Sequence, residues 1–213
     1  LDGPRRFYQS DAQYNRHSEQ ILPFVDTVLK ESGLTLRDID AIAFGAGPGA
    51  FTGLRVACGV AQGLGWATEK PLVAVSNLEA VAVKDQFEGR ILVALDARMK
   101  ECYVAAYEVK GRFLCSTLLE ALVAKPEDLG ALCERIGATA VSGDAFNRYA
   151  DCIDLPGGVR VLEKSPATAL EIAVLAKKRA QDGKTVTALN AAPIYVRNRV
   201  ALTIDERAKG VKL

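Results

Sequence analysis

Residues 45–55, Gly-Ala-Gly-Pro-Gly-Ala-Phe-Thr-Gly-Leu-Arg, have the composition of a turn that binds phosphate. They follow a short apolar segment, residues 40–44, that predicts a strand, and they precede a segment that predicts a helix. A Walker-type site ends in Gly-Lys followed by Ser or Thr, because the lysine reaches the phosphates and the hydroxyl reaches magnesium. Here Gly53 is followed by Leu54 and Arg55 instead. The residues therefore argue against a Walker-type site.

A dinucleotide-binding turn also fits this stretch poorly. It would need glycine in place of Ala50 and an acidic residue after the next predicted strand, residues 71–75. That strand runs into Ser76 and Asn77. The alternative that stays open is structural, since glycines also permit a sharp reversal from a strand to a helix.

The helix predicted over residues 52–68 is unusual because it contains four glycines. Small residues recur every four positions in two rows, which are Gly53, Ala57, Ala61 and Gly65, and Gly59, Gly63 and Ala67. Each interior glycine costs roughly 1 kcal/mol relative to alanine, so we expect close packing to hold this helix. The neighbour is either the protein's own sheet or first helix, or a helix of another molecule.

Four motifs lie in order along nearly the whole chain. They are residues 47–55, the preceding helix predicted over 17–32, residues 95–99 with Glu101 and Tyr103, and residues 193–198. Together they resemble the TsaB family, also called YeaZ. The resemblance implies a two-lobed α/β fold of the actin, sugar kinase and Hsp70 type, with ribonuclease-H-like lobes. It also implies a non-catalytic relative of the TsaD ATPase, which it joins to make threonylcarbamoyladenosine at position 37 of tRNAs that read ANN codons.

The resemblance further implies an interface, because TsaB proteins pair through two helices per subunit. The matching segments are residues 17–32 and 52–68, and we expect them to bind a TsaD homologue, or a second copy when TsaD is absent. The expected interface residues are His17, Ile21, Leu22, Val25, Leu29, Gly53, Ala57, Gly59 and Gly63. The family motif loop comprises Gly47, Pro48, Gly49, Phe51, Thr52 and Arg55. We expect no cofactor on this chain alone, ATP or ADP at the complex with TsaD, a TsaE-type ATPase in that complex, and indirect contact with tRNA.

The second lobe is expected to open with three strands, at residues 90–96, 101–109 and 112–118. Active members of the superfamily place Asp-Gly-Gly after the first strand, so that backbone amides approach a phosphate. This chain has Asp96-Ala97-Arg98-Met99, whose side chains occupy that space. Asp96 and Arg98 remain candidate anion contacts, although an arginine in this position is more often a surface ion-pair residue. The departure favours binding over catalysis.

The amino-acid composition limits which classes of protein this chain can belong to. With 213 residues, of which 49% are apolar, we expect an N-terminal lobe at residues 1–89 and a C-terminal lobe at 90–213. A net charge of +1 argues against a dedicated nucleic-acid binder, and five scattered cysteines with one histidine indicate neither a disulfide framework nor a metal site of the TsaD kind. We expect a cytoplasmic protein with no membrane span, since no apolar run approaches roughly 20 residues.

The two ends of the chain lead to separate expectations. Family members open with a strand that carries an Asp-Thr-Ser/Thr motif, whereas Leu1-Asp2-Gly3 predicts the turn of a later hairpin, so the first strand is expected to be missing here. The basic residues near the other end, Arg197, Arg199, Arg207, Lys209 and Lys212, predict a solvated terminus, with a partner or tRNA contact as the alternative.

Two other function classes stay open at this point. One is an active ATPase or small-molecule kinase of the same fold, which would turn over ATP alone. The other is a self-sufficient homodimeric scaffold, which would have no affinity for TsaD.

Overall fold

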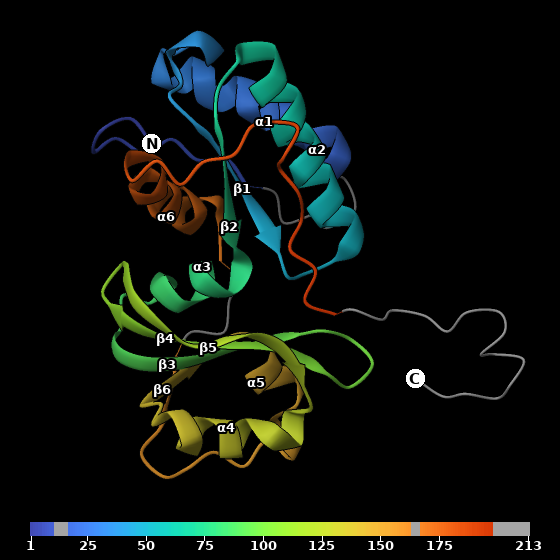
Figure 1. The fold of residues 1–213 in the computed structure, drawn as a ribbon, viewed down its shortest axis with the longest axis vertical. Coiled ribbons are helices and arrows are strands. Elements are labelled where there is room, and N and C mark those ends of the chain that lie inside the picture. Colours follow the sequence, from blue (N-terminus) through green and yellow to red (C-terminus); the bar gives the residue numbers. More distant parts are fainter. Residues whose placement is uncertain (11–16, 163–166, 198–213) are drawn as a thin grey trace, which may run out of the picture.

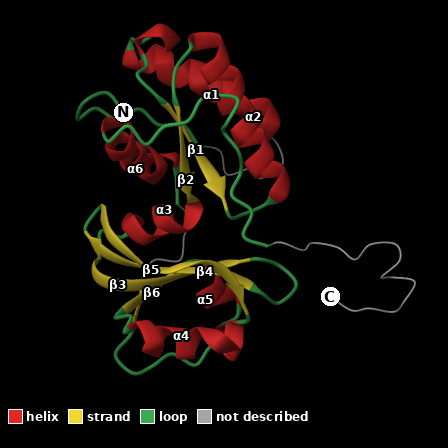
Figure 2. Ribbon diagram, in the orientation of Figure 1, coloured by secondary structure: helices red, strands yellow, loops and turns green. Residues whose placement is uncertain are grey.

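The computed structural model describes residues 1–10, 17–162 and 167–197, and the chain forms two lobes (Figure 1). Helices surround a pair of strands in the first lobe, and a larger sheet with helices on its outer side forms the second (Figure 2). This two-lobed α/β arrangement confirms the predicted fold class.

The elements of the first lobe are α1 (His17–Ser32), η1 (Leu36–Asp38), β1 (Ile42–Gly47), α2 (Phe51–Thr68), β2 (Leu72–Ser76), α3 (Asn77–Lys84) and α6 (Ala169–Gln181). Those of the second are β3 (Glu88–Asp96), β4 (Cys102–Lys110), β5 (Phe113–Ala124), η2 (Pro126–Asp128), α4 (Leu129–Ile136), β6 (Ala140–Ser142), α5 (Ala145–Arg148), η3 (Ala150–Cys152) and β7 (Arg160–Val161). The helices predicted over 17–32 and 52–68 are confirmed, the second to within one residue.

In the first lobe, β1 runs parallel to β2, and α2 connects them. The inner side of α2 packs on this pair, because Cys58 and Ala61 lie in one buried cluster with Phe44 of β1 and Leu72 of β2. The helix ends at Glu69, whose left-handed backbone lets its N–H donate to the carbonyl of Gly65.

The second lobe is built on a five-stranded sheet of order β5-β4-β3-β6-β7. β3, β4 and β5 correspond to the three strands predicted at the start of the second lobe and pair antiparallel, while β6 and β7 continue the sheet in parallel. α4 and α5 cover one face of this sheet, and α3 covers the other (Figure 1).

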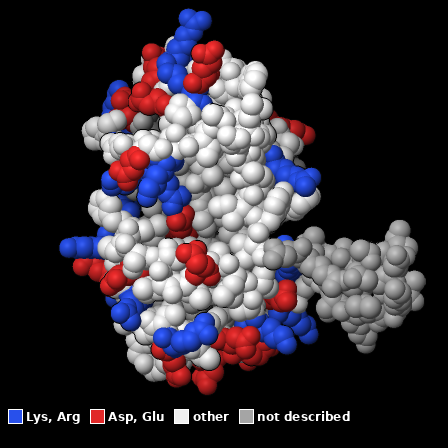
Figure 3. All heavy atoms as spheres, in the orientation of Figure 1, with Lys and Arg blue, Asp and Glu red and all other residues white. Residues whose placement is uncertain are grey.

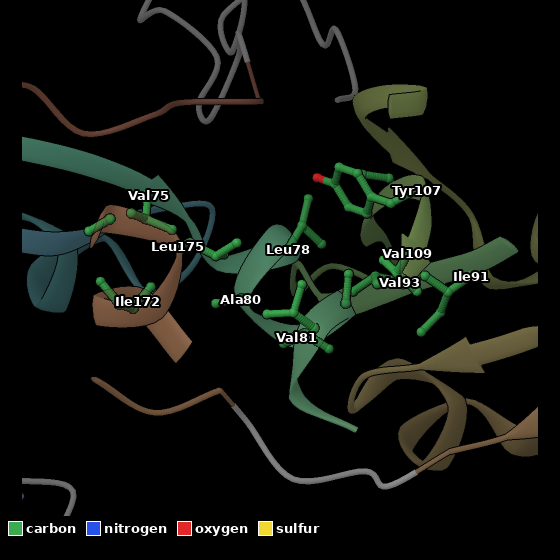
Figure 4. Packing of buried hydrophobic residues seen from close by; sticks show 14 of the residues in the cluster. Val75, Leu78, Ala80, Val81, Ile91, Val93, Tyr107, Val109, Ile172 and Leu175 are labelled. Atoms are coloured by element: carbon green, nitrogen blue, oxygen red, sulfur yellow. The ribbon is translucent and has the colours of Figure 1, made fainter. Parts of the chain in front are cut away.

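α3 lies between the lobes and joins their cores. Its fully buried Leu78 and Val81 belong to one apolar cluster with Val75 of β2, with Leu175 of α6 and with Val93 of β3 (Figure 4). The capping box that begins α3, Ser76 with Glu79, fixes where the helix leaves β2. The lobes therefore share a continuous hydrophobic core.

The chain returns to the first lobe after β7, which differs from the predicted division at residues 89 and 90. α6 packs against β1 and β2, and Val186 beyond it bridges Leu72 in antiparallel pairing. The predicted turn at Leu1-Asp2-Gly3 is confirmed, since the backbones of Asp2 and Arg5 exchange two hydrogen bonds. Among the described residues, the sheet of the first lobe consists of β1 and β2.

Candidate functional site

The glycines at the end of β1 and in the turn to α2, here called the glycine turn, permit close packing within the chain itself. Gly47 has a φ of +121°, and a Cβ on it would lie 2.8 Å from the carbonyl oxygen of Ile194. A Cβ on Gly45 would lie 2.6 Å from Oδ1 of Asn77, whose Nδ2 donates to the carbonyl of Pro48 at 3.0 Å. The space in front of these glycines is thus filled by the side chain after β2 and by the C-terminal segment, in agreement with the structural alternative.

Residues 193–197 bring the family motifs of both lobes together. The N–H of Ile194 donates to the carbonyl of Ala46 at 2.7 Å, directly beside the glycine turn. Arg197 pairs with Glu101 at the start of the second lobe, and its Nη1 lies 3.4 Å from Sδ of Met99. Arg197 is therefore held in an ion pair, which corrects its expected place in a solvated tail, while Arg199, Arg207, Lys209 and Lys212 lie outside the described residues.

A cluster of two aromatic side chains and an arginine, here named the Arg55 cluster, lies where this segment meets α2. The guanidinium of Arg55 lies 4.0 Å from the ring centroid of Phe51, and its Nε donates to the hydroxyl of Tyr195 at 3.2 Å. The rings of Phe51 and Tyr195 are 6.1 Å apart. All three side chains are exposed, and no carboxylate among the described residues pairs with Arg55.

Asp96, at the end of β3, is the centre of a network within the second lobe. Its side chain is only 7% exposed and accepts hydrogen bonds from the hydroxyl of Tyr149 at 2.7 Å and the N–H of Arg98 at 2.9 Å. Nε of Arg148 lies 3.1 Å from the same carboxylate. Desolvation, together with the hydrogen bond to Asp96, raises the pKa of Tyr149. The carboxylate is therefore engaged by the protein's own donors.

The turn that follows Asp96 carries three successive non-glycine residues in the left-handed region. Arg98, Met99 and Lys100 have φ values of 62°, 56° and 57°. Nη1 of Arg98 lies 3.4 Å from Oδ2 of Asp96, so this arginine forms an ion pair within its own turn while remaining exposed. This agrees with the ion-pair alternative for Arg98 rather than with a free anion contact.

The small residues of α2 face two different ways. A Cβ on Gly65 would lie 2.7 Å from Cδ2 of the buried Leu72, so Gly65 faces the sheet. A Cβ on Gly53, Gly59 or Gly63 would meet no atom within 4 Å. The second row of small residues thus faces open space, and the described chain does not supply the close neighbour that we expected for it.

Apolar side chains flank this outward face. Leu22 of α1 is 54% exposed and Trp66 of α2 is 68% exposed, and α1 packs beside α2 (Figure 1). Figure 3 shows few charged side chains where α2 and residues 185–197 run on this face. A largely uncharged surface of this kind is typical of a protein–protein interface.

Two further properties of the described residues bear on function. No three His, Cys, Asp or Glu side chains among them come together in a group that could hold a metal ion. Of the helices in the described ranges, none is both long enough and apolar enough to span a membrane.

Comparison with known proteins identifies the family. The family model described as "TsaD: tRNA N6-adenosine threonylcarbamoyltransferase" matches residues 11–165. The "tRNA threonylcarbamoyladenosine biosynthesis protein TsaB" of Escherichia coli (strain K12) is 35% identical over 190 residues, which cover 87% of this chain and 82% of that protein. The chain belongs to the TsaB family. The Haemophilus influenzae protein of the same name is also 35% identical, over 86% of this chain and 81% of its own length.

Solved structures agree with the assignment to TsaB, which is also called YeaZ. A Pseudomonas aeruginosa crystal structure, described as an uncharacterized protein with similarity to peptidase YEAZ, superimposes with a TM-score of 0.79 at 32% identity. It covers 88% of this chain, which in turn covers 87% of it. A second structure, described as YeaZ from the same organism, gives a TM-score of 0.75 at 32% identity.

In this TsaB chain, the residues predicted for the interface divide by exposure. Leu22, Gly59 and Gly63 are exposed, whereas the half-buried members are Ile21, Val25, Leu29, Gly53 and Ala57. His17 begins α1, and its side chain lies outside the described part. In the motif loop, Phe51, Thr52 and Arg55 are exposed, while Gly47 and Pro48 are buried and Gly49 is half-buried.

Sequence reasoning missed Arg148, Tyr149, Tyr195 and Trp66. Arg148 at the end of α5 and Tyr149 directly after it contact Asp96 from more than 50 residues away, and nothing in their spacing signals this contact. Tyr195 lies in the motif at residues 193–198, but its contact with Arg55 spans 140 residues and has no local signal. Trp66 could have been predicted as part of the outward face of α2, because it follows Gly59 and Gly63 at helical spacing.

Proposed function

We propose that this chain is a non-catalytic accessory subunit that binds a TsaD homologue through α1 and α2. In that role it supports the threonylcarbamoylation of adenosine 37 in tRNAs that read ANN codons. The observation that carries the proposal is the open space in front of Gly59 and Gly63. The relatives named as tRNA threonylcarbamoyladenosine biosynthesis proteins supply the pathway.

The argument for a partner starts from the cost of these glycines. Each lowers helix stability by roughly 1 kcal/mol relative to alanine. Gly65 offsets this cost by letting the helix approach Leu72, but Gly59 and Gly63 touch nothing that a methyl group would displace. Glycines in such positions let a second helix approach at the short end of the usual range of roughly 8–10 Å between axes. A helix of another subunit is the neighbour that explains them.

We propose that this subunit is not catalytic because the two loops that would bind phosphate in an active relative, the glycine turn and the turn after Asp96, are filled by the protein itself. Ile194 and Asn77 fill the space in front of the glycine turn. Side chains follow Asp96, and its carboxylate already accepts hydrogen bonds from Tyr149 and Arg98. We propose that ATP or ADP binds at the complex with the TsaD homologue, that a TsaE-type ATPase joins this complex, and that tRNA contacts mainly the partner.

The test is to block the outward face of α2 while leaving the fold intact. Gly59→Leu and Gly63→Leu place a side chain in open space, so circular dichroism should show a folded chain with wild-type helix content. Titration calorimetry with the TsaD homologue should show loss of binding. The matched control is Gly157→Leu, which fills open space at an exposed glycine of the second lobe. Unchanged affinity of the α2 variants would refute the proposal, and ATP turnover by the purified chain alone would favour an active ATPase instead.

A further inference from the structure

A cavity with a volume of about 270 Å³, here named the interlobe cavity, is lined by residues of both lobes. Its first-lobe wall includes Ser76 and Glu79 at the start of α3 and Arg179 of α6, and its second-lobe wall includes Tyr107 of β4 and Glu120 of β5. None of the described residues that line it belongs to α1 or α2, so it is separate from the docking face proposed above. Pockets for drug-sized ligands begin at roughly 300 Å³, so this cavity suits a smaller molecule.

The first-lobe wall of the interlobe cavity favours a negatively charged group. Nη2 of Arg179 donates to Oε1 of Glu79 at 2.5 Å, and Nη1 of the same guanidinium donates to the carbonyl of Ala74 at 3.1 Å. A guanidinium has five N–H donors in a planar fork, so these two bonds fix its position and leave donors that can bind a carboxylate. Ser76 caps the N-terminus of α3, where the helix dipole also favours an anion.

The second-lobe wall favours a positively charged group. Glu120 is exposed and, among the described residues, forms no ion pair. Thr117 pairs with Tyr107 across β5 and β4, and both residues line the cavity. The oxygen of Tyr107 points away from Val109 in the apolar cluster (Figure 4), and a side-chain hydrogen bond joins it to Ser76. Carboxylate and hydroxyl oxygens are the acceptors that the three donors of an ammonium group require.

Arg179 and Glu120 carry opposite charges on the two walls, yet no ion pair joins them. The guanidinium nitrogens of Arg179 lie more than 4.0 Å from the carboxylate oxygens of Glu120. A small molecule between them meets both charges at once when it carries a carboxylate and an ammonium group close together. An α-amino acid has this arrangement, and Ala121 and Ile194 give its side chain an apolar part of the lining.

We propose that the interlobe cavity binds a small α-amino acid as its zwitterion, with the carboxylate at Arg179 and the ammonium group at Glu120. The hydroxyl groups of Thr117 and Tyr107 supply further acceptors for the ammonium group. Because the ligand contacts residues of both lobes in the folded chain only, its binding raises the Tm of the protein. This site goes beyond the docking role of α2 and does not depend on it.

Titration calorimetry and thermal unfolding of the full chain test the class of ligand. Free glycine, alanine, serine and threonine are the probes, and we expect them to bind and to raise the Tm. N-acetylthreonine lacks the ammonium group and threoninol lacks the carboxylate, so each should bind about tenfold more weakly than threonine, as the loss of one charged contact predicts. Binding of either derivative as tightly as threonine, or no binding of any of the four amino acids, would overturn the proposal.

Substitutions at Glu120 test the place of the ammonium group. Glu120→Gln should weaken threonine binding about tenfold and leave the Tm of the free chain unchanged, because this carboxylate forms no ion pair within the described chain. Glu120→Lys puts a second cation into the cavity, so this variant should lose threonine binding and bind the dicarboxylate succinate instead. The matched control is Glu108→Gln, since Glu108 is an exposed glutamate of β4 outside the lining of the cavity. Threonine affinity that is unchanged in Glu120→Gln, or lowered equally in Glu108→Gln, would overturn the assignment.

Discussion

Replacing Gly59 and Gly63 together by alanine should stabilise the free subunit while weakening its association. Alanine at an interior helix position is favoured over glycine by roughly 1 kcal/mol, and the new methyl groups meet no atom within 4 Å. The two sites together should add about 2 kcal/mol to the free energy of unfolding. For a domain of this size, about 1 kcal/mol corresponds to a shift of 2–4 °C in Tm, so we expect a rise of about 4–8 °C.

Gly65→Ala is the matched control in the same helix. Its Cβ would lie 2.7 Å from Cδ2 of Leu72 and 3.2 Å from the carbonyl oxygen of Lys70. Leu72 is fully buried, and overpacking of a core typically costs about 1–3 kcal/mol, which cancels or exceeds the gain in helix propensity. We therefore expect Gly65→Ala to leave Tm unchanged or to lower it.

The assay is thermal and urea unfolding at several protein concentrations, extrapolated to the monomer, beside titration of the TsaD homologue. If the double alanine variant is more stable but binds the TsaD homologue less tightly, binding is the reason that glycine stands at these positions, although alanine would make the free subunit more stable. Destabilisation of the monomer by the double alanine variant, or equal stabilisation by Gly65→Ala, would refute the assignment of the two faces of α2.

Four further outcomes are expected. Asp96→Ala should lower the free energy of unfolding by about 2–4 kcal/mol in urea titrations, because a buried acceptor of several hydrogen bonds is lost; an unchanged midpoint would contradict the network. Arg197→Met, which breaks the ion pair with Glu101, should cost about 1 kcal/mol in the same measurement. In native labelling at pH 8, the exposed Cys115 and Cys152 should react with iodoacetamide and the buried Cys102 should not. Burial raises the pKa of the Cys102 thiol from 9.0 to about 12, so the unfolded chain loses this proton at a lower pH than the folded chain. The contribution of the thiol to the free energy of unfolding is therefore fully present below pH 9 and is lost as pH rises toward 12. A free energy of unfolding that stays constant across this range would contradict this.

Local patterns predicted the elements well, and their long-range contacts poorly. α1 and α2 follow from apolar and small residues at helical spacing, and the hairpin of β4 and β5 follows from its turn at residues 110–111. Whether the glycine turn faced a ligand or the chain itself was undecidable from spacing, because the answer depends on Ile194, far along the sequence.

The same reason explains the division into lobes. A break at residues 89 and 90 matches the point where the second sheet begins, but no local signal tells that α6 packs back on β1 and β2. The candidate site was recovered in part for this reason. The glycines of α2 predicted a close neighbour for this helix. Tyr195 and Leu189 lie near the two ends of α2 only because the segment after α6 packs back on the first lobe, which no local pattern indicates.

The position of α3 between the sheets has a consequence for how the polypeptide unfolds. Leu78 and Val81 are covered on one side by Val75 and Leu175 and on the other by Val93, so separating the halves would expose both flanks of this helix to water. Fragments cut near residue 89 should aggregate when expressed singly, and the intact chain should melt in one calorimetric transition.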